Sequence, residues 1–150
     1  MAELLNIENN VVIRLEFNEK ESLGKSDYES WVICTLELLI CNMIKKKMIL
    51  TMTLYEIENL IFGIKDCIMK LDENRPYKFS FMNYEADFET SIDVVTEDEF
   101  FEIQIWFNIA SYTKGKKWGY DDGVRFIADK KGVLSFYNML LEEFRLLKNM

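Results

Sequence analysis

The segment 87–111 constrains the fold more than any other, because it predicts two long strands joined by a tight acidic turn at 96–98. In both strands apolar residues alternate with polar ones, which is the pattern of a strand with one buried and one solvated face. The apolar set is Phe88, Ile92, Val94, Phe101, Ile103, Ile105, Phe107 and Ile109. The opposite face carries Asp87, Glu89, Asp93, Glu102 and Trp106. The first set needs the rest of the chain to cover it, and the second predicts an acidic, partly aromatic face that is open to solvent.

The length and composition predict a single domain, 1–150. A chain of 150 residues that is 49% hydrophobic can bury roughly 70% of the surface that its unfolded form would expose. One proline, Pro76, and six scattered glycines leave no low-complexity linker at which the chain would divide.

The charge balance indicates the class of partner. There are 26 acidic and 18 basic residues, which give a formal net charge of −8. Such a charge repels nucleic-acid phosphates and attracts basic partners, including the clefts of nucleases, although it also simply keeps a protein soluble. We therefore predict no direct binding to nucleic acid.

No segment predicts secretion or a membrane span. The N-terminal segment 1–10 has no basic stretch followed by an apolar one, and the longest apolar candidate, 31–42, is shorter than the roughly 20 residues that a span requires. We therefore predict a cytoplasmic protein without membrane contact. Cys34, Cys41 and Cys67 lie in apolar segments, which predicts buried free thiols in a reducing compartment.

Three strands are predicted first, at 11–17, 31–41 and 46–52, because apolar and β-branched residues alternate or cluster there. A polar loop at 18–30 and a polar turn at 42–45 separate them.

A helix is predicted from Thr53, because Thr53 and Glu56 have the spacing of a capping box. Its apolar stripe is Leu54, Ile57, Ile61, Ile64, Ile68 and Leu71. Gly63 lies inside this pattern and indicates a close approach between the helix and a strand. The helix is expected to end before 72–76.

The second half predicts a strand at 77–82, the hairpin described above, a strand at 124–129 and a helix from about Gly132. The apolar positions of this helix are Val133, Phe136, Leu140, Phe144 and Leu147. The order is three strands, a helix, three or four strands and a helix. We therefore predict an α+β fold with a largely antiparallel sheet of six or seven strands, both helices packed on one face and the opposite face free.

No catalytic, cofactor or metal site is predicted. The chain has no histidine, which excludes nucleophilic systems and metal sites that need one. The segment 114–117 lacks the glycine spacing and the Ser or Thr of a phosphate-binding loop, and 121–123 is too short for a calcium loop. The loop 113–123 instead places Trp118 and Tyr120 among lysines, which makes it a second candidate contact site.

Two segments resemble the front half of WapI-type immunity proteins: 27–33, with the sequence Asp-Tyr-Glu-Ser-Trp-Val-Ile, and 53–60, with Thr-Leu-Tyr-Glu-Ile-Glu-Asn-Leu. These small cytoplasmic bacterial proteins protect a cell from the toxic C-terminal domain of a secreted wall-associated or polymorphic toxin. The later strand pair and the closing helix are compatible with that family, so the resemblance covers most of the chain. It implies a non-enzymatic binder whose partner is a cognate toxin domain, in that family often a nuclease.

We therefore predict that the acidic face occupies the basic active-site cleft of a toxin, with Trp118 and Tyr120 as an additional anchor. Two alternatives stay open. The domain would self-associate as a regulatory or scaffold protein, through an exposed sheet edge or Trp106. In the second alternative the domain is a carboxylate-based hydrolase, which requires two acids in different environments within a deep cavity.

Overall fold

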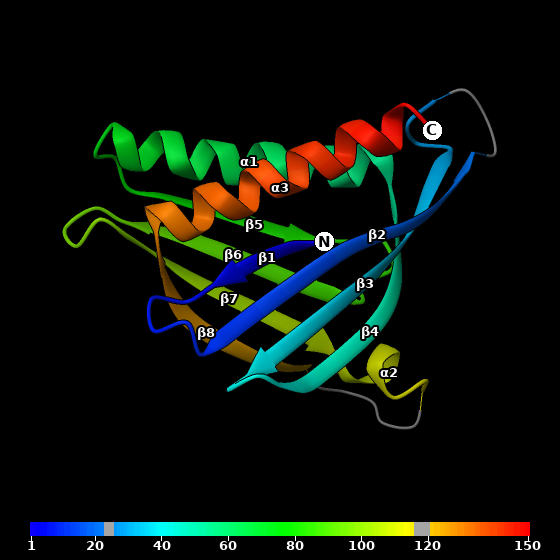
Figure 1. Cartoon of the computed structure of the whole chain (residues 1–150), viewed down its shortest axis with the longest axis horizontal. Helices are drawn as coiled ribbons and strands as arrows, with labels where there is room; N and C mark the ends of the chain where they lie inside the picture. Colours follow the sequence, from blue (N-terminus) through cyan, green and yellow to red (C-terminus); the bar gives the residue numbers. More distant parts are fainter. Residues whose placement is uncertain (23–25, 116–120) are drawn as a thin grey trace.

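The computed structural model describes residues 1–22, 26–115 and 121–150. The chain forms two antiparallel four-stranded sheets, each a simple meander in which consecutive strands are neighbours (Figure 1). The first contains β1 (Ala2–Leu5), β2 (Val11–Ser22), β3 (Ser30–Ile40) and β4 (Met43–Thr53). The second contains β5 (Tyr77–Met82), β6 (Phe88–Val95), β7 (Phe100–Asn108) and β8 (Asp121–Asp129). The helices are α1 (Leu54–Asp72), α2 (Ile109–Tyr112) and α3 (Lys130–Lys148).

The two sheets face each other and enclose one hydrophobic core. Their strands cross in the view of Figure 1, with β1–β4 in front of β5–β8. Leu36 of the first sheet and Phe101 and Phe107 of the second are at most 2% exposed and belong to the same apolar cluster. A cavity of about 40 Å³ within this core is lined by residues of both sheets, α1 and α3.

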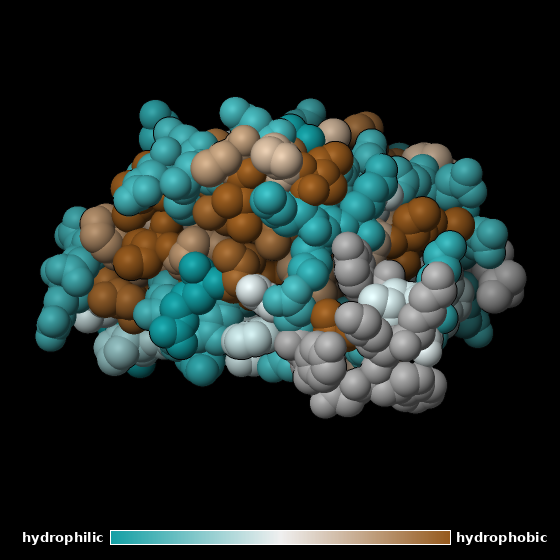
Figure 2. Space-filling model, turned by 90° about the horizontal axis from the view of Figure 1, so that it is seen from below, coloured by the Kyte–Doolittle hydropathy of each residue, from teal (hydrophilic) through white to brown (hydrophobic). Residues whose placement is uncertain are grey.

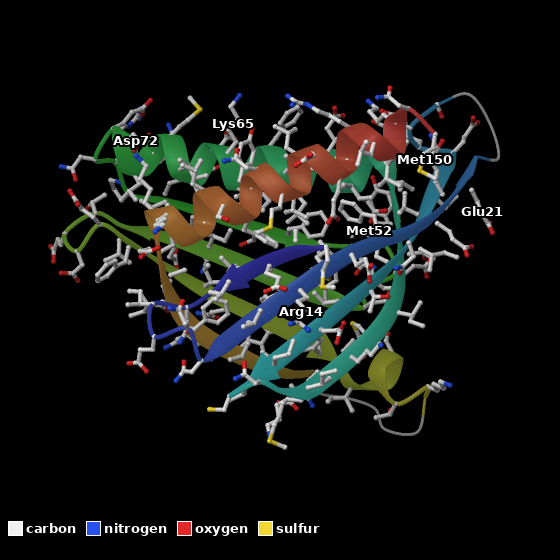
Figure 3. All side chains as sticks on the ribbon, in the orientation of Figure 1. Arg14, Glu21, Met52, Lys65, Asp72 and Met150 are labelled. Atoms are coloured by element: carbon white, nitrogen blue, oxygen red, sulfur yellow. The ribbon has the colours of Figure 1, made fainter. Side chains whose placement is uncertain are left out.

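The two long helices lie side by side along one open side of this pair of sheets, and α1 and α3 contact each other (Figure 1). The predicted capping box at Thr53 and Glu56 is present, and every residue of the predicted apolar stripe of α1 is buried. The five predicted apolar positions of α3 are buried as well. Figure 3 shows Lys65 on the side of α1 that faces away from the sheets, whereas Asp72, at the end of α1, forms an ion pair with Lys130 at the start of α3. No helix within the described ranges is long and apolar enough to cross a membrane.

The prediction of antiparallel strands and an α+β fold is confirmed, but the prediction of one sheet of six or seven strands covered by two helices is wrong. The chain leaves the first sheet after β4, crosses through α1 and starts a second sheet at β5. Because each meander has its own apolar face, the two sheets bury these faces against each other, and the helices close the side between them. The short strand β1 was not predicted, and the prediction missed α2.

A two-residue turn, Cys41–Asn42, joins β3 to β4, whereas the sequence predicts a turn at 42–45. Both residues have positive φ angles, 51° and 64°, as a type I′ hairpin turn requires. The predicted burial of Cys34 and Cys67 is confirmed, but Cys41 is exposed because it occupies this turn. Burial raises the pKa of Cys34 and of Cys67 to about 12.

A buried polar network joins the start of α1 to the β5–β6 turn. The Glu56 carboxylate, which is 2% exposed, accepts from the Thr53 amide at 2.7 Å and from the Tyr84 amide at 2.5 Å. Asn83 lies in the same turn and is 1% exposed. Its side-chain oxygen accepts from the Asp87 amide at 2.9 Å, and its side-chain nitrogen donates to the Asp87 carboxylate at 2.9 Å. The network therefore fixes the turn from which β6 enters the second sheet.

Candidate binding face on the second sheet

The second sheet has one face that is turned away from the core and open to solvent, and we call it the outer face. Its side chains are Lys78, Ser80, Met82, Glu89, Ser91, Asp93, Glu102, Gln104, Trp106, Arg125 and Ile127, and Gly123 lies among them. Four of the seven predicted contact residues are on it: Glu89, Asp93, Glu102 and Trp106. The alternation in β6 and β7 therefore predicted correctly which side chains would share this face.

The outer face is less acidic than predicted, because two cations from neighbouring strands lie on it. The Lys78 ammonium is 4.0 Å from the Asp93 carboxylate, and the Arg125 guanidinium is 3.3 Å from the Glu102 carboxylate. Two cations against Glu89, Asp93 and Glu102 leave a formal charge of 2 − 3 = −1. Glu89 is the acid on this face that has no ion-pair partner within the described ranges.

A row of hydrogen bonds along β7 orients the exposed tryptophan of the face. The Trp106 indole N–H donates to the Gln104 side-chain oxygen at 3.3 Å, and the Gln104 amide donates to Glu102 at 3.5 Å. Glu102 also binds Arg125. Although Trp106 is 41% exposed, its ring is therefore held in place by its neighbours on the strand.

The opposite strand gives the Trp106 ring its platform. Gly123 lies directly across from Trp106, and a Cβ atom at Gly123 would lie 2.7 Å from the indole and 2.4 Å from the Ile105 carbonyl oxygen. Such distances are too short for any side chain. Glycine at this position therefore allows the indole to lie against the β8 backbone.

Beside the ring there is a small groove of about 120 Å³, lined by Met82, Ala86, Phe88, Glu89, Trp106 and Asn108. Met82 is 56% exposed and pairs across the sheet with Glu89, which pairs in turn with Trp106. An exposed thioether and indole on either side of one carboxylate can receive an apolar side chain together with a basic group. We call Met82, Glu89 and Trp106 the groove residues.

Asp87, which the sequence places on the acidic face, belongs to the β5–β6 turn instead. It precedes β6, and its carboxylate is bonded to the buried Asn83 side chain. Asp87 therefore has a structural role, and its charge reversal would disturb the turn. The remaining predicted contact residues, Trp118 and Tyr120, lie outside the residues that the structure describes.

A cluster of three tyrosines was not identified from the sequence. Tyr28 and Tyr55 are stacked, with ring centroids 4.3 Å apart, and Tyr28 and Tyr84 are 57% and 60% exposed. A side-chain hydrogen bond between Tyr28 and Tyr55 raises the pKa of Tyr28, and nearby Tyr84 raises it further. We call these residues the tyrosine cluster. The sequence gives no signal for it, because its members come from three distant segments.

The structure offers little for catalysis on the outer face. The carboxylates lie on open strands, and the groove beside them contains one acid, Glu89. Within the described ranges, no group of three His, Cys, Asp or Glu side chains is placed to hold a metal ion.

Comparisons with known proteins add a distant similarity. No protein-family model matches the chain, and no curated protein matches it. The solved structure of the plant transcriptional regulator PBF-2 is 11% identical with a TM-score of 0.42, covering 93% of this chain and 76% of that one. WHY1 from Arabidopsis thaliana is also 11% identical, with a TM-score of 0.41, covering 91% of this chain and 83% of that one. Similarity at this level carries no information about function.

Proposed function

We propose that this protein is a non-enzymatic immunity protein that binds and neutralises a toxin domain, such as a nuclease, through the outer face of its second sheet. The observation that carries the proposal is the exposed and orientated Trp106 beside Met82 and Glu89. Tryptophans in such settings supply most of the binding energy in many protein interfaces. The net charge of −8 adds long-range attraction to a basic partner, and the resemblance of 27–33 and 53–60 to WapI-type immunity proteins supplies the class of partner.

The outer face is suited to this role because its anchor is held in place before binding. The bonds from Trp106 to Gln104 and from Gln104 to Glu102 reduce the freedom that the side chains would lose on association. Asp93 and Glu102 are already engaged by Lys78 and Arg125. We therefore assign the main electrostatic contact to Glu89.

The first test is to co-purify the tagged protein with the toxin-domain product of the adjacent gene and to measure toxin activity in the complex. The Trp106→Ala variant is expected to bind at least about 30-fold more weakly than the parent protein. The separate variant Glu89→Lys is also expected to bind more weakly, with a larger loss in low salt than in high salt. Both side chains are exposed, so the variants should fold.

The matched control is Glu97→Lys, which makes the same change in net charge in the β6–β7 turn, at the other end of β6 from Glu89. It is expected to bind and protect like the parent protein. If Trp106→Ala and Glu89→Lys also protect fully, the outer face is not the toxin-binding surface.

Self-association is a second candidate function, favoured by an apolar row across the outer side of the first sheet. Leu5, Val12, Leu39 and Ile44 are partners in register on neighbouring strands; Val12 and Leu39 are buried, and Ile44 is the exposed end of the row. Exposed Met43, Ile44 and Ile49 follow on the edge strand β4. Figure 2 shows hydrophobic side chains gathered on the side of the molecule that lies below in Figure 1, where β4 runs.

Sedimentation over a wide concentration range separates this candidate from the first. A self-associating protein would give a mass that rises with concentration, and the double variant Ile44→Lys/Ile49→Lys would sediment as a monomer. A constant monomer mass for the parent protein would exclude self-association through this row.

A further inference from the structure

A second contact surface lies at the tyrosine cluster, where three chain segments meet. Tyr28 precedes β3, Tyr55 lies in the first turn of α1, and Tyr84 lies in the β5–β6 turn. In Figure 1 the first turn of α1 and the start of β3 both lie toward the right-hand end of the molecule. The bond from the Tyr84 amide to Glu56 fastens the β5–β6 turn to the same end of α1.

The cluster is exposed, although the Tyr28 and Tyr55 rings are stacked and the Tyr84 backbone is bonded to Glu56. Tyr28 and Tyr55 stack at 4.3 Å with an interplanar angle of 30°, yet Tyr28 and Tyr84 are more than half exposed. These rings do not belong to the hydrophobic core. A stacked pair of rings with a further exposed ring nearby is a feature of binding surfaces more than of ordinary protein surface.

The charges around the cluster are negative. Glu29 and Glu85 are exposed and adjacent in sequence to Tyr28 and Tyr84. Glu58 lies near Tyr55, whose pKa is lowered chiefly by a side-chain hydrogen bond with Asn59, against the smaller opposing effect of the Glu58 charge. No ion-pair partner of Glu29, Glu58 or Glu85 is present in the described part of the chain. Asp27, by contrast, is engaged by Lys148 at 3.2 Å. Carboxylates of this kind repel phosphates and attract cations.

We propose that the tyrosine cluster is a docking site for an arginine side chain of a protein partner. The guanidinium would stack on the exposed rings, and the neighbouring carboxylates would bind its N–H groups. Arginine suits both contacts, because its group is planar, weakly hydrated and carries five donors, whereas the lysine ammonium is a strongly hydrated point charge. In the described part of the chain, no lysine or arginine lies over these rings, although Lys70 and Lys148 lie over Tyr77 and Phe144. The inference goes beyond the proposed function and does not depend on the outer face being the toxin-binding surface.

The probe is an end-blocked hexa-arginine peptide, titrated into the full-length protein while the tyrosine ring signals are followed by NMR. The signals of Tyr28 and Tyr84 are expected to shift together and to saturate. The double variant Tyr28→Leu/Tyr84→Leu is expected to bind about 5- to 30-fold more weakly, since a cation over each of two exposed rings contributes about 0.5–1 kcal/mol. The corresponding double Phe variant keeps both rings and is expected to bind within about twofold of the parent protein.

Two controls separate the site from general charge attraction. Phe62→Leu removes another exposed aromatic ring, on α1, without changing the charge, and should leave binding unchanged. Hexalysine has the same charge as hexa-arginine and is expected to bind several-fold more weakly, because it cannot stack.

The inference is overturned by any of three results. These are equal binding of the two peptides, parent-like binding by the double Leu variant, or shifts of the tyrosine signals on addition of single-stranded oligothymidine but not of peptide. The experiment contains no toxin, so its failure would leave neutralisation through the outer face untouched. Loss of neutralisation in the outer-face variants would equally leave the peptide result unchanged.

Discussion

At the scale of single residues, Gly63 shows how one missing side chain sets the distance between a helix and a sheet. A Cβ atom at this position would lie 2.1 Å from the ring of Phe79 on β5. The prediction from the sequence that the helix closely approaches a strand here is therefore confirmed. The cost of glycine within the helix is offset by this close packing.

We expect Gly63→Ala to lower the free energy of unfolding by about 1–3 kcal/mol, because the ring must move to make room. Helix propensity alone would raise it by about 1 kcal/mol, so the sign of the change decides between the two effects. Urea unfolding measures it, and Lys65→Ala, on the solvent side of the same helix, should change it by less than about 0.5 kcal/mol. A stabilised Gly63→Ala protein would show that the helix and β5 are less tightly packed than described.

The three cysteines should differ in reactivity. At pH 8 a thiol reagent is expected to modify Cys41 quickly, whereas Cys34 and Cys67 react after unfolding in urea, since each is 0% exposed and has a pKa of about 12. Rapid reaction of two or three thiols in the folded protein would contradict this.

The same shifts predict how stability depends on alkaline pH. The folded pKa values of Cys34 and Cys67 lie above those of the unfolded chain, so the folded state keeps protons that the unfolded state loses. The contribution of these thiols is complete below the unfolded pKa and falls as the pH rises from about 8.5 toward 12. The double variant Cys34→Ala/Cys67→Ala should therefore lose less stability than the parent protein between pH 8 and pH 10.

At the scale of secondary structure, the junction of β4, α1 and the β5–β6 turn depends on the single carboxylate of Glu56. We expect Glu56→Ala to lower the free energy of unfolding by about 2–4 kcal/mol, because the buried amides of Thr53 and Tyr84 lose their acceptor. Thermal unfolding measures the loss. Glu58→Ala, two residues further along the same helix, should leave the free energy of unfolding nearly unchanged. Equal effects of the two substitutions would contradict the role of the network.

The elements that depend on local alternation could be predicted from the sequence. In β7, Phe101 and Ile103 point into the core and Glu102 and Gln104 point outward, as the period of two requires. The Cys41–Asn42 turn could not be found in this way, because it lacks the glycine that usually marks a type I′ turn. The four-residue strand β1 is too short to show a pattern, and its partner β2 supplies its hydrogen bonds.

The candidate site was predictable only in part for a similar reason. Local alternation placed Glu89 and Trp106 on one face, but the neutralisation of Glu102 depends on Arg125, which reaches it through the register of β7 and β8. Pairing between strands is decided by tertiary packing, which single-strand patterns do not contain. The tyrosine cluster depends entirely on such long-range placement.

At the scale of the whole molecule, the shared core predicts that the two sheets unfold together. Neither sheet can bury its apolar face alone, because residues of both sheets and both long helices belong to one cluster. Trp31 reports on the first sheet and Trp106 on the second, so variants that keep one tryptophan, with the others replaced by phenylalanine, follow each sheet separately by fluorescence. In each variant, we expect the denaturant midpoint measured by tryptophan fluorescence to equal the midpoint measured by circular dichroism. Two separate transitions would show that the sheets are independent units.

The division into two successive meanders also sets the order in which the two sheets are synthesised on the ribosome. The first sheet and α1 end at Asp72, so that half is synthesised before any strand of the second sheet. At about 5–20 residues per second, the remaining part of the chain takes on the order of 4–16 s to synthesise. During that interval the apolar face of the first sheet has no partner, and chaperone binding to the nascent chain is expected to be strongest there.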